Sequence, residues 1–286
     1  AMYGHDIVIF ESREKPGGLN EFGIAAYKTV DGFAQREVDF VLSIGGIVIQ
    51  YGQELGDGLS LEQLQSDYDA VFLGMGLAGV NALQMPGADA DGVVDAVDFI
   101  AGLRQSADKS DIAVGRRIVV IGGGMTAIDA AVQAKLLGAE DVTICYRRGK
   151  DQMNASGFEQ DLATSRGVVI RHWLQPEKVN ATDGNVQSVT LEYTSQADGK
   201  LAGTGETMTI AADQVLVAIG QKLEASGLGS PVKLDGGRIA TDQDGRTSAD
   251  KVWAGGDCTN SGDDLTVTAV AQGRDAAEAI NDTLKH

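Results

Sequence analysis

The sequence predicts an α/β protein of two domains, in which short parallel strands alternate with helices. The chain has 286 residues, of which 43% are hydrophobic, and this is enough for two cores. Its 38 glycines against 4 prolines indicate many tight turns. A strand–helix–strand pattern occurs twice, over residues 6–52 and 117–148.

The first strand–helix–strand pattern begins with the apolar run DIVIFE, which ends in Glu11. Residues 31–44 place apolar side chains near helical spacing, and GGIVIQYG follows as a strand. A strand that ends in an acid is how a dinucleotide-binding unit holds a ribose diol. Glu11 is therefore a candidate ribose ligand, and the alternative is an ordinary strand that ends in Glu. The glycine-rich phosphate loop that normally lies about 20 residues before such an acid is not found in the ten residues before Glu11.

The remaining elements continue the alternation. A capped helix is expected from Ser60, followed by a buried strand in AVFLGMG, residues 70–76. A Pro-Gly turn precedes a helix within residues 85–105, and residues 168–219 alternate strands with polar turns. The chain closes with a strand, a glycine–acid loop and a long helix that begins near Thr266.

The strongest motif is VVIGGGMTAIDAA, in which Gly122, Gly124 and Ala127 fit G-x-G-x-x-A between a strand and a helix. Gly122 permits the tight turn, Gly124 lets a pyrophosphate approach the backbone, and the small Ala127 lets the helix lie close to the strand. A plain strand-to-helix turn is the alternative. The flanking elements favour dinucleotide binding.

Arg147 and Arg148 follow the next strand, at the place where an NAD site would have an acid. Two guanidiniums at this place suit a 2′-phosphate, so the sequence favours NADPH over NADH. A solvated surface pair in an acidic protein is the alternative.

The closing loop VWAGGDCTNSGDDLTVTAVAQGRDAAEAI carries Gly256 and Asp257 after a strand. An acid after a glycine turn can accept hydrogen bonds from ribityl hydroxyls, and a helix N-terminus can face the pyrimidine edge of a reduced flavin. An ordinary Asp-capped loop is the alternative.

Together REKPGGL, VVIGGGMTAID, YRR, VLVAIG and the closing loop resemble, in order and separation, the small (β) subunit of NADPH-dependent glutamate synthase and the flavin/NADPH part of dihydropyrimidine dehydrogenase. The resemblance covers essentially the whole chain. It implies two Rossmann-like domains of the three-layer FAD/NAD(P)-binding type that pass electrons from NADPH through FAD to iron–sulfur clusters and a partner. With the motif glycines, the candidate residues for FAD are Glu11, Gly17, Gly18, Leu19, Gly256, Asp257, Thr266 and Val267. Those for NADPH are Gly122, Gly124, Thr126, Ala127, Arg147 and Arg148, and Gly220 of VLVAIG is a further cofactor-binding candidate.

The chain also departs from this family. Members begin with a cysteine-rich iron–sulfur region and a strand–GxGxxG–helix unit, and this sequence starts after both, so we expect an N-terminally truncated FAD domain that binds FAD weakly or not at all. Met125 stands where Asn or Asp is usual, and GIAAYKT at 23–29 replaces a typical Pro- and Arg-containing segment.

We expect a discontinuous FAD-type domain at 1–88 and 222–286, and an NADPH domain at 89–221. The expected reaction is hydride transfer from NADPH to FAD and onward to a larger catalytic subunit. The alternatives are the flavin subunit of dihydropyrimidine dehydrogenase and a non-catalytic NADPH-binding module. No catalytic side chain is proposed, because His5, His172 and His286 are scattered. Asp263 and Asp264 are expected to cap a helix in solvent and not to bind a metal.

Composition narrows the remaining choices. The net charge of −18 disfavours nucleic acid and anionic membrane surfaces as partners. Cys145 and Cys258 form no CxxC pair, which argues against a disulfide framework, an iron–sulfur site or a dithiol redox centre in this chain. No signal peptide or long apolar run is present in the sequence. A reducing cytoplasm is the expected location.

Overall fold

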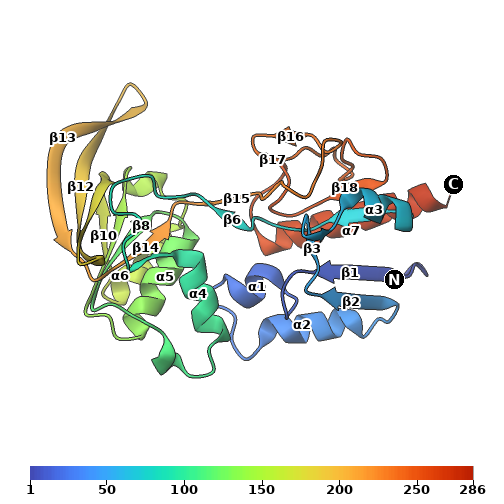
Figure 1. Ribbon diagram of the computed structural model, residues 1–286, viewed down its shortest axis with the longest axis horizontal. Coiled ribbons are helices and arrows are strands. Elements are labelled where there is room, and N and C mark those ends of the chain that lie inside the picture. The colour runs from blue at the N-terminus through green and yellow to red at the C-terminus, as the bar shows by residue number, and fades with distance from the viewer. Residues whose placement is uncertain (286) are drawn as a thin grey trace. The chain divides into compact units, whose positions relative to one another are not determined.

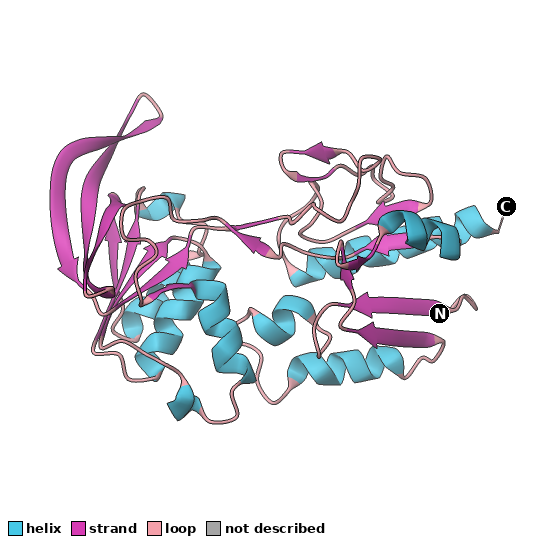
Figure 2. Cartoon of the chain, viewed as in Figure 1, coloured by secondary structure: helices cyan, strands magenta, loops and turns pink. Residues whose placement is uncertain are grey.

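The computed structural model describes residues 1–285, so His286 lies outside the described residues. The chain divides into two compact units. The central unit comprises 19–32 and 81–220, and the terminal unit comprises 1–18, 33–80 and 221–286. These bounds differ from the expected ones chiefly at 19–32, which the sequence placed with the terminal segments. Figures 1 and 2 show the elements of each unit.

The central unit is built on a five-stranded sheet in which all neighbouring strands run parallel. The strand order is β10-β9-β8-β14-β7. The strands are β7 (Val93–Asp95), β8 (Arg117–Gly122), β9 (Asp141–Tyr146), β10 (Val169–His172) and β14 (Gln214–Ala218). Because strands β8 and β14 are nearly continuous apolar runs, both faces of this sheet must be covered.

Helices cover one face of this sheet and a second sheet covers the other (Figure 1). The helices α4 (Ala96–Gln105), α5 (Met125–Leu136) and α6 (Gly157–Ser165) pack on Ile118 and Val120 of β8. Val119 and Ile121 point to the opposite core, against the antiparallel strands β11 (Leu174–Thr182), β12 (Asn185–Ala197) and β13 (Lys200–Ala211). The alternation along one strand therefore builds three layers, as predicted.

The terminal unit contains two separate sheets in which two strands of three or more residues run parallel. In the first, β1 (Ile7–Glu11) and β2 (Ile47–Tyr51) are joined through α2 (Phe33–Leu42). In the second, β5 (Val71–Leu73) pairs with β18 (Val252–Ala254). Three more pairs are short: β3 (Glu54–Leu55) with β4 (Gly58–Leu59), β6 (Gly79–Val80) with β15 (Gln221–Lys222), and β16 (Leu234–Asp235) with β17 (Arg238–Ile239).

Two further helices belong to the terminal unit. The five-residue α1 (Gly18–Phe22) starts at the last residue of segment 1–18 and continues into segment 19–32 of the central unit. The helix α3 (Leu61–Asp67) begins where predicted, because the Ser60 hydroxyl accepts a hydrogen bond from the Gln63 amide at 3.1 Å. The helix α7 (Thr266–Leu284) also begins at the predicted residue. Their unit has its own core, which includes Leu64 and Val252.

The region 85–105 contains the predicted turn and the predicted helix, but an unpredicted strand lies between them. A strand, β7, comes first, and α4 begins only at Ala96. The segment Val93–Asp95 extends because it pairs with Val215–Val217 at the edge of the central sheet, and this pairing is a long-range contact that local patterning does not reveal.

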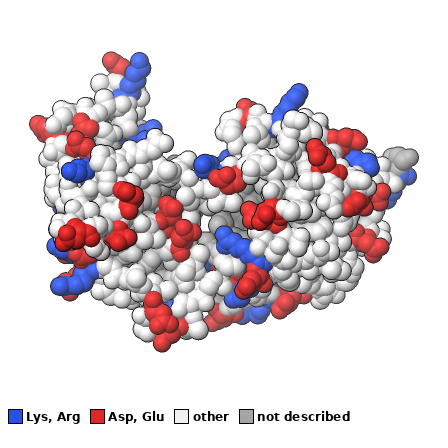
Figure 3. Space-filling model, viewed as in Figure 1, with Lys and Arg blue, Asp and Glu red and all other residues white. Residues whose placement is uncertain are grey.

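The surface charge and the two cysteines agree with what the composition indicates. Acidic side chains are spread over the face shown in Figure 3. Both cysteines are buried free thiols, and burial raises the pKa of Cys145 to about 12. Among residues 1–285, no helix is both long and apolar enough to cross a membrane.

Candidate functional site

The glycine loop of the central unit joins β8 to α5. Gly122 has φ +149°, and a Cβ placed on it would lie 2.2 Å from the Ala218 carbonyl oxygen. A Cβ on Gly123 would lie 2.4 Å from the Tyr146 ring. A Cβ on Gly124 would meet no atom within 4 Å. The first two glycines are thus required by packing within the protein, whereas the third leaves open space for a ligand.

Gly124 is also the N-cap of α5 and offers no side-chain acceptor. Among the described residues, the amides of Met125 and Thr126 donate to no protein acceptor, so the first turn presents free N–H groups. Ala127 is fully buried, as the motif predicts. The loop therefore has the open backbone and helix dipole that a phosphate needs.

Arg147 and Arg148 follow β9, which pairs with β8, so they lie at the same carboxyl edge as the glycine loop. The Thr194 hydroxyl donates to the Arg147 carbonyl at 2.8 Å, and the Trp173 amide donates to the Arg148 carbonyl at 3.2 Å. Both backbones are thereby fixed. Within residues 1–285 neither guanidinium forms an ion pair or hydrogen bond, so both are available to an anion.

Gly220 lies two residues beyond Ala218, whose partner across the sheet is Gly122. It has φ +102°, and its carbonyl accepts from the Asn81 amide at 3.1 Å. The structure therefore brings all six NADPH candidates and Gly220 to one edge of the central sheet.

The terminal unit contains the other candidates. Glu11 ends β1, and its carboxylate accepts from the Arg13 amide at 2.9 Å. Gly17 and Gly18 follow in a left-handed turn, with φ +116° and +52°. The Gln35 side chain fastens this turn to α2 by donating to the Pro16 carbonyl at 2.8 Å.

Leu19, the next candidate, is 42% exposed. By its contacts it belongs to the central unit. The sequence placed it with the terminal segments. The chain first passes from the terminal unit to the central unit directly after the turn at Gly17 and Gly18.

Asp257 follows β18 in a glycine turn fixed by a hydrogen bond from the Gly256 amide to the Gln272 side chain at 2.6 Å. Burial, with a contribution from Asp264, raises the pKa of Asp257. Thr266 begins α7, and Val267 is 73% exposed. The loop thus presents a half-buried acid next to a helix N-terminus, as predicted.

The expectation that Asp263 and Asp264 cap α7 is wrong. The N-cap is Leu265, which has no capping side chain. Asp264 instead forms a two-point ion pair with Arg238, with N–O distances of 2.5 and 2.7 Å. No group of three metal-ligating side chains occurs among the described residues.

The glycine-rich stretch GMGLAG at 74–79 does not lead into a helix, so it offers no helix N-terminus to a second pyrophosphate. This loop leaves β5 and enters strand β6, and the next helix, α4, begins only at Ala96. Within the described part of the terminal unit, the candidate acids Glu11 and Asp257 are present without a phosphate loop of the kind found at Gly122–Gly124.

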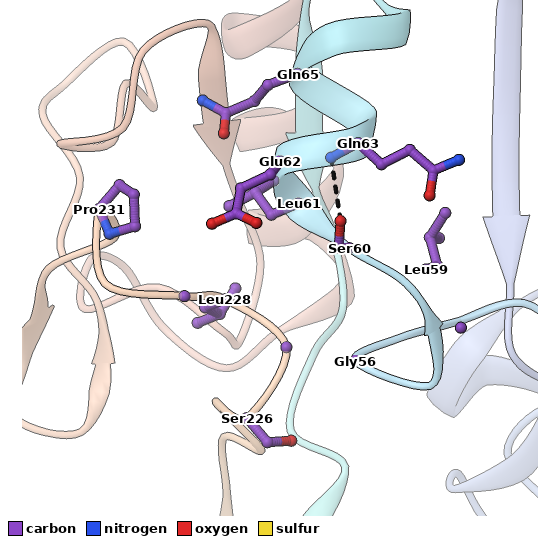
Figure 4. A pocket seen from close by; sticks show the side chains of 13 residues that line it. Gly56, Leu59, Ser60, Leu61, Glu62, Gln63, Gln65, Ser226, Leu228 and Pro231 are labelled. Atoms are coloured by element: carbon purple, nitrogen blue, oxygen red, sulfur yellow. Dashed lines mark hydrogen bonds between the residues drawn. The ribbon is translucent and has the colours of Figure 1, made fainter.

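The terminal unit also contains a hollow of about 440 Å³ (Figure 4). It lies between the start of α3 and the loop 226–231, with Leu61, Leu228 and Pro231 among its lining residues. Ser60 faces it but is already engaged as the N-cap of α3. None of the predicted site residues lines this hollow.

Sequence reasoning missed a set of buried polar contacts that fasten residues 19–32 to the central unit. Asp129 and Gln133 of α5 accept from the Ala25 and Ala26 amides at 3.1 and 3.0 Å. Arg104 of α4 donates to backbone carbonyls of the same segment, including that of Ile24 at 3.0 Å. The available signal was Asp129 and Gln133, four residues apart within the otherwise apolar stretch 127–134 of an Ala-rich helix.

The remaining histidines stay outside both candidate sites as described. His5 lies within 3.2 Å of the Asn281 side-chain oxygen. Burial and then Lys150 lower the pKa of His172, against an opposing effect of Asp151. That the chain uses no catalytic side chain stays a prediction.

A three-layer α/β unit with an open glycine loop at a helix N-terminus, together with a second α/β unit in the same chain, is typical of nucleotide-dependent oxidoreductases. The chain belongs to the pyridine nucleotide-disulphide oxidoreductase family, whose profile matches residues 3–273. This membership confirms the predicted fold, and it confirms FAD and NADPH as the expected cofactors at the level of the family.

Two relatives confirm the resemblance inferred from the motifs. The small chain of glutamate synthase [NADPH] from Escherichia coli (strain K12) is 33% identical over 99% of this chain and 64% of its own length. NAD-dependent dihydropyrimidine dehydrogenase subunit PreT from the same organism is also 33% identical, over 99% and 63%. The chain thus spans less than two thirds of these relatives.

Solved structures agree on the fold. Mycobacterium tuberculosis FprA in complex with NADPH has a TM-score of 0.75 at 18% identity, over 97% of this chain and 77% of that one. Thioredoxin reductase from T. acidophilum has a TM-score of 0.77 at 20% identity, over 99% and 92%.

Proposed function

We propose that this chain is the hydride-transfer part of an NADPH-dependent flavoprotein of the glutamate synthase small-chain type. The central unit binds NADPH, and the terminal unit binds the ribose, ribityl and ring portions of FAD. Electrons then leave for iron–sulfur clusters and a larger catalytic subunit outside this chain. FAD, when bound, supplies the acceptor for the hydride, and the protein supplies position and field.

The observation that carries this proposal is the pairing of an open helix N-terminus with two free guanidiniums. The Gly124 turn suits the pyrophosphate, and the first-turn amides of α5 can donate to it. Arg147 and Arg148 suit the 2′-phosphate that distinguishes NADPH from NADH.

Calorimetric titration with NADPH and NADH tests this assignment. We expect NADPH to bind more tightly, and Arg147→Ala to reduce the preference roughly ten-fold, since a charge-assisted bond contributes about 1.5–3 kcal/mol before solvent losses. Arg116→Ala is the matched control, because it removes the same charge at the opposite edge of the sheet, where Arg116 pairs with Glu140 at 2.7 Å. Equal dissociation constants for the two nucleotides in the wild-type chain would contradict the assignment.

We expect this chain alone to bind FAD weakly or not at all. Glu11 and Asp257 suit ribose and ribityl hydroxyls, but a pyrophosphate needs amides at a helix N-terminus, and GMGLAG leads into a strand. We expect purified protein to be pale. A stoichiometric yellow preparation that survives dialysis would show that a different part of the chain binds the pyrophosphate.

A non-catalytic NADPH-binding module is the second candidate, and the absence of a second phosphate loop from the described terminal unit favours it. The flavin subunit of a dihydropyrimidine dehydrogenase is the alternative among enzymes, supported by the similarity to PreT. The FAD-loaded chain should reduce an artificial dye with NADPH, but it should neither form glutamate nor reduce uracil without a partner. Failure to reduce the dye when FAD is bound would favour the non-catalytic module.

A further inference from the structure

A buried charge cluster lies behind the glycine loop of the central unit, formed by Lys28, Asp129 and Glu159. The Lys28 ammonium contacts the two carboxylates at 2.7 and 2.9 Å. The side chains of Asp129 and Glu159 are 6% and 11% exposed, whereas that of Lys28 is 28% exposed. The cluster thus holds two carboxylates and one cation in a poorly solvated place.

Both carboxylates are fixed to the segments that form the glycine loop. Asp129 lies four residues after Met125, the first residue of α5, which corresponds to about 6 Å along the helix axis. Its Cβ points back toward the helix N-terminus. Glu159 accepts from the Ser156 amide at 2.9 Å, and the preceding Ala155 amide donates to the Gly123 carbonyl at 3.1 Å.

Two negative charges this close would oppose an anion at the first turn of α5, because Coulomb interactions are strong where water is excluded. Lys28 reduces the local charge from two negative to one. Burial lowers the pKa of Lys28, but the hydrogen bonds to Asp129 and Glu159 outweigh burial, so the net effect raises it and the lysine stays charged. The compensating cation comes from segment 19–32 and not from the nucleotide fold itself.

Resting on the proposed NADPH site, we propose that Lys28 is an affinity-determining residue for the dinucleotide. It acts without touching the ligand, by neutralising carboxylates behind the phosphate loop. Binding linkage then requires that a bound dinucleotide favour the docked position of segment 19–32. The amides of Ala25 and Ala26, which donate to Asp129 and Gln133, mark that docked position.

Calorimetric titration with NADPH separates charge from packing. Lys28→Met should weaken binding about ten-fold, and Lys28→Gln should do the same, because it keeps a hydrogen-bond donor but no charge. Lys28→Arg should stay within about two-fold of wild type. The double variant Lys28→Met/Asp129→Asn should recover most of the loss, since it removes the uncompensated carboxylate.

Lys135→Met is the matched control. It removes a lysine from the far end of α5, where the ammonium caps the Ala139 and Glu140 carbonyls, and should leave the affinity unchanged. Wild-type affinity in Lys28→Gln, or no recovery in the double variant, would overturn the proposal.

Thermal unfolding of the protein without NADPH tests the role of Lys28 independently of the proposed NADPH site. If wild type binds no NADPH, the NADPH assignment fails, but charge compensation remains testable by thermal unfolding. Lys28→Met should then lower the unfolding temperature, and adding Asp129→Asn should raise it again. An unfolding temperature lower still in the double variant would reject the compensating role of Lys28.

Discussion

The two strand–helix–strand units of this chain differ sharply in burial although their sequences have the same pattern. In the central unit, every residue of α5 from Ala127 to Ala134 is buried. In the terminal unit, Ala34 is the only buried residue of α2, and Val48 of β2 is 58% exposed. The central strands lie in a five-stranded sheet covered on both faces, whereas β1 and β2 form a sheet of two. A strand–helix–strand pattern therefore fixes local structure, and the surrounding sheet decides how much apolar surface is buried.

The largest expected effect comes from shortening one apolar side chain to alanine in each unit. Ile128→Ala, at a fully buried position of α5, should destabilise its unit by about 2–5 kcal/mol, because it leaves a cavity in a close-packed core. Val48→Ala should cost under about 1 kcal/mol, because most of its side chain already contacts water. Urea unfolding followed by circular dichroism measures both. Similar losses at the two positions would contradict the contrast in burial.

A smaller effect separates the glycines of the central loop. Gly122→Ala should cost about 1–3 kcal/mol, because its φ is +149° and a methyl group would meet the Ala218 carbonyl. Gly124→Ala should fold almost normally, since φ is −96° and the space is open, but it should weaken NADPH binding by covering the phosphate approach. Thermal unfolding and calorimetry read the two properties separately. A Gly124→Ala variant that binds NADPH like wild type would place the phosphate elsewhere.

The smallest effect concerns the acid of the terminal unit. Because burial and Asp264 raise the pKa of Asp257, the folded state holds that proton more tightly than the unfolded state. The stabilisation from protonation is therefore fully present below the unfolded pKa, near 4, and is lost as pH rises through the folded pKa. Asp257→Asn should raise the unfolding temperature slightly at pH 7 and lose this advantage near pH 4. A pH-independent difference would show that Asp257 has an ordinary carboxyl pKa.

Local sequence patterns were sufficient to predict the elements that begin at a capping residue or a glycine turn. The start of α3 followed from Ser60, and the loop before α5 followed from three glycines between an apolar strand and an Ala-rich helix. These signals depend on neighbours in sequence, where capping and backbone freedom act directly. The prediction that Arg147 and Arg148 lie near the glycine loop also needed only their position, directly after the strand that follows the glycine motif.

Features that depend on long-range pairing could not be predicted in the same way. Asp264 pairs with Arg238, 26 positions away, and so does not cap α7. Segment 19–32 joins the central unit because Arg104 and Asp129 hold its backbone, at separations of about 80 residues or more. Such partners become visible only when distant elements meet.

Each unit contains one tryptophan, so the fluorescence of each tryptophan reports on one unit. The chain has 2 tryptophans, Trp173 in the central unit and Trp253 in the terminal unit. Trp173 is half-buried, and its indole packs on Gly149, directly after the paired arginines. Trp253 is 2% exposed, with the Arg246 guanidinium 5.1 Å from its ring centre. We therefore expect the fluorescence of Trp173 to change when an anion binds near Arg147 and Arg148. We expect Trp253 to emit at shorter wavelength and to be protected from aqueous quenchers.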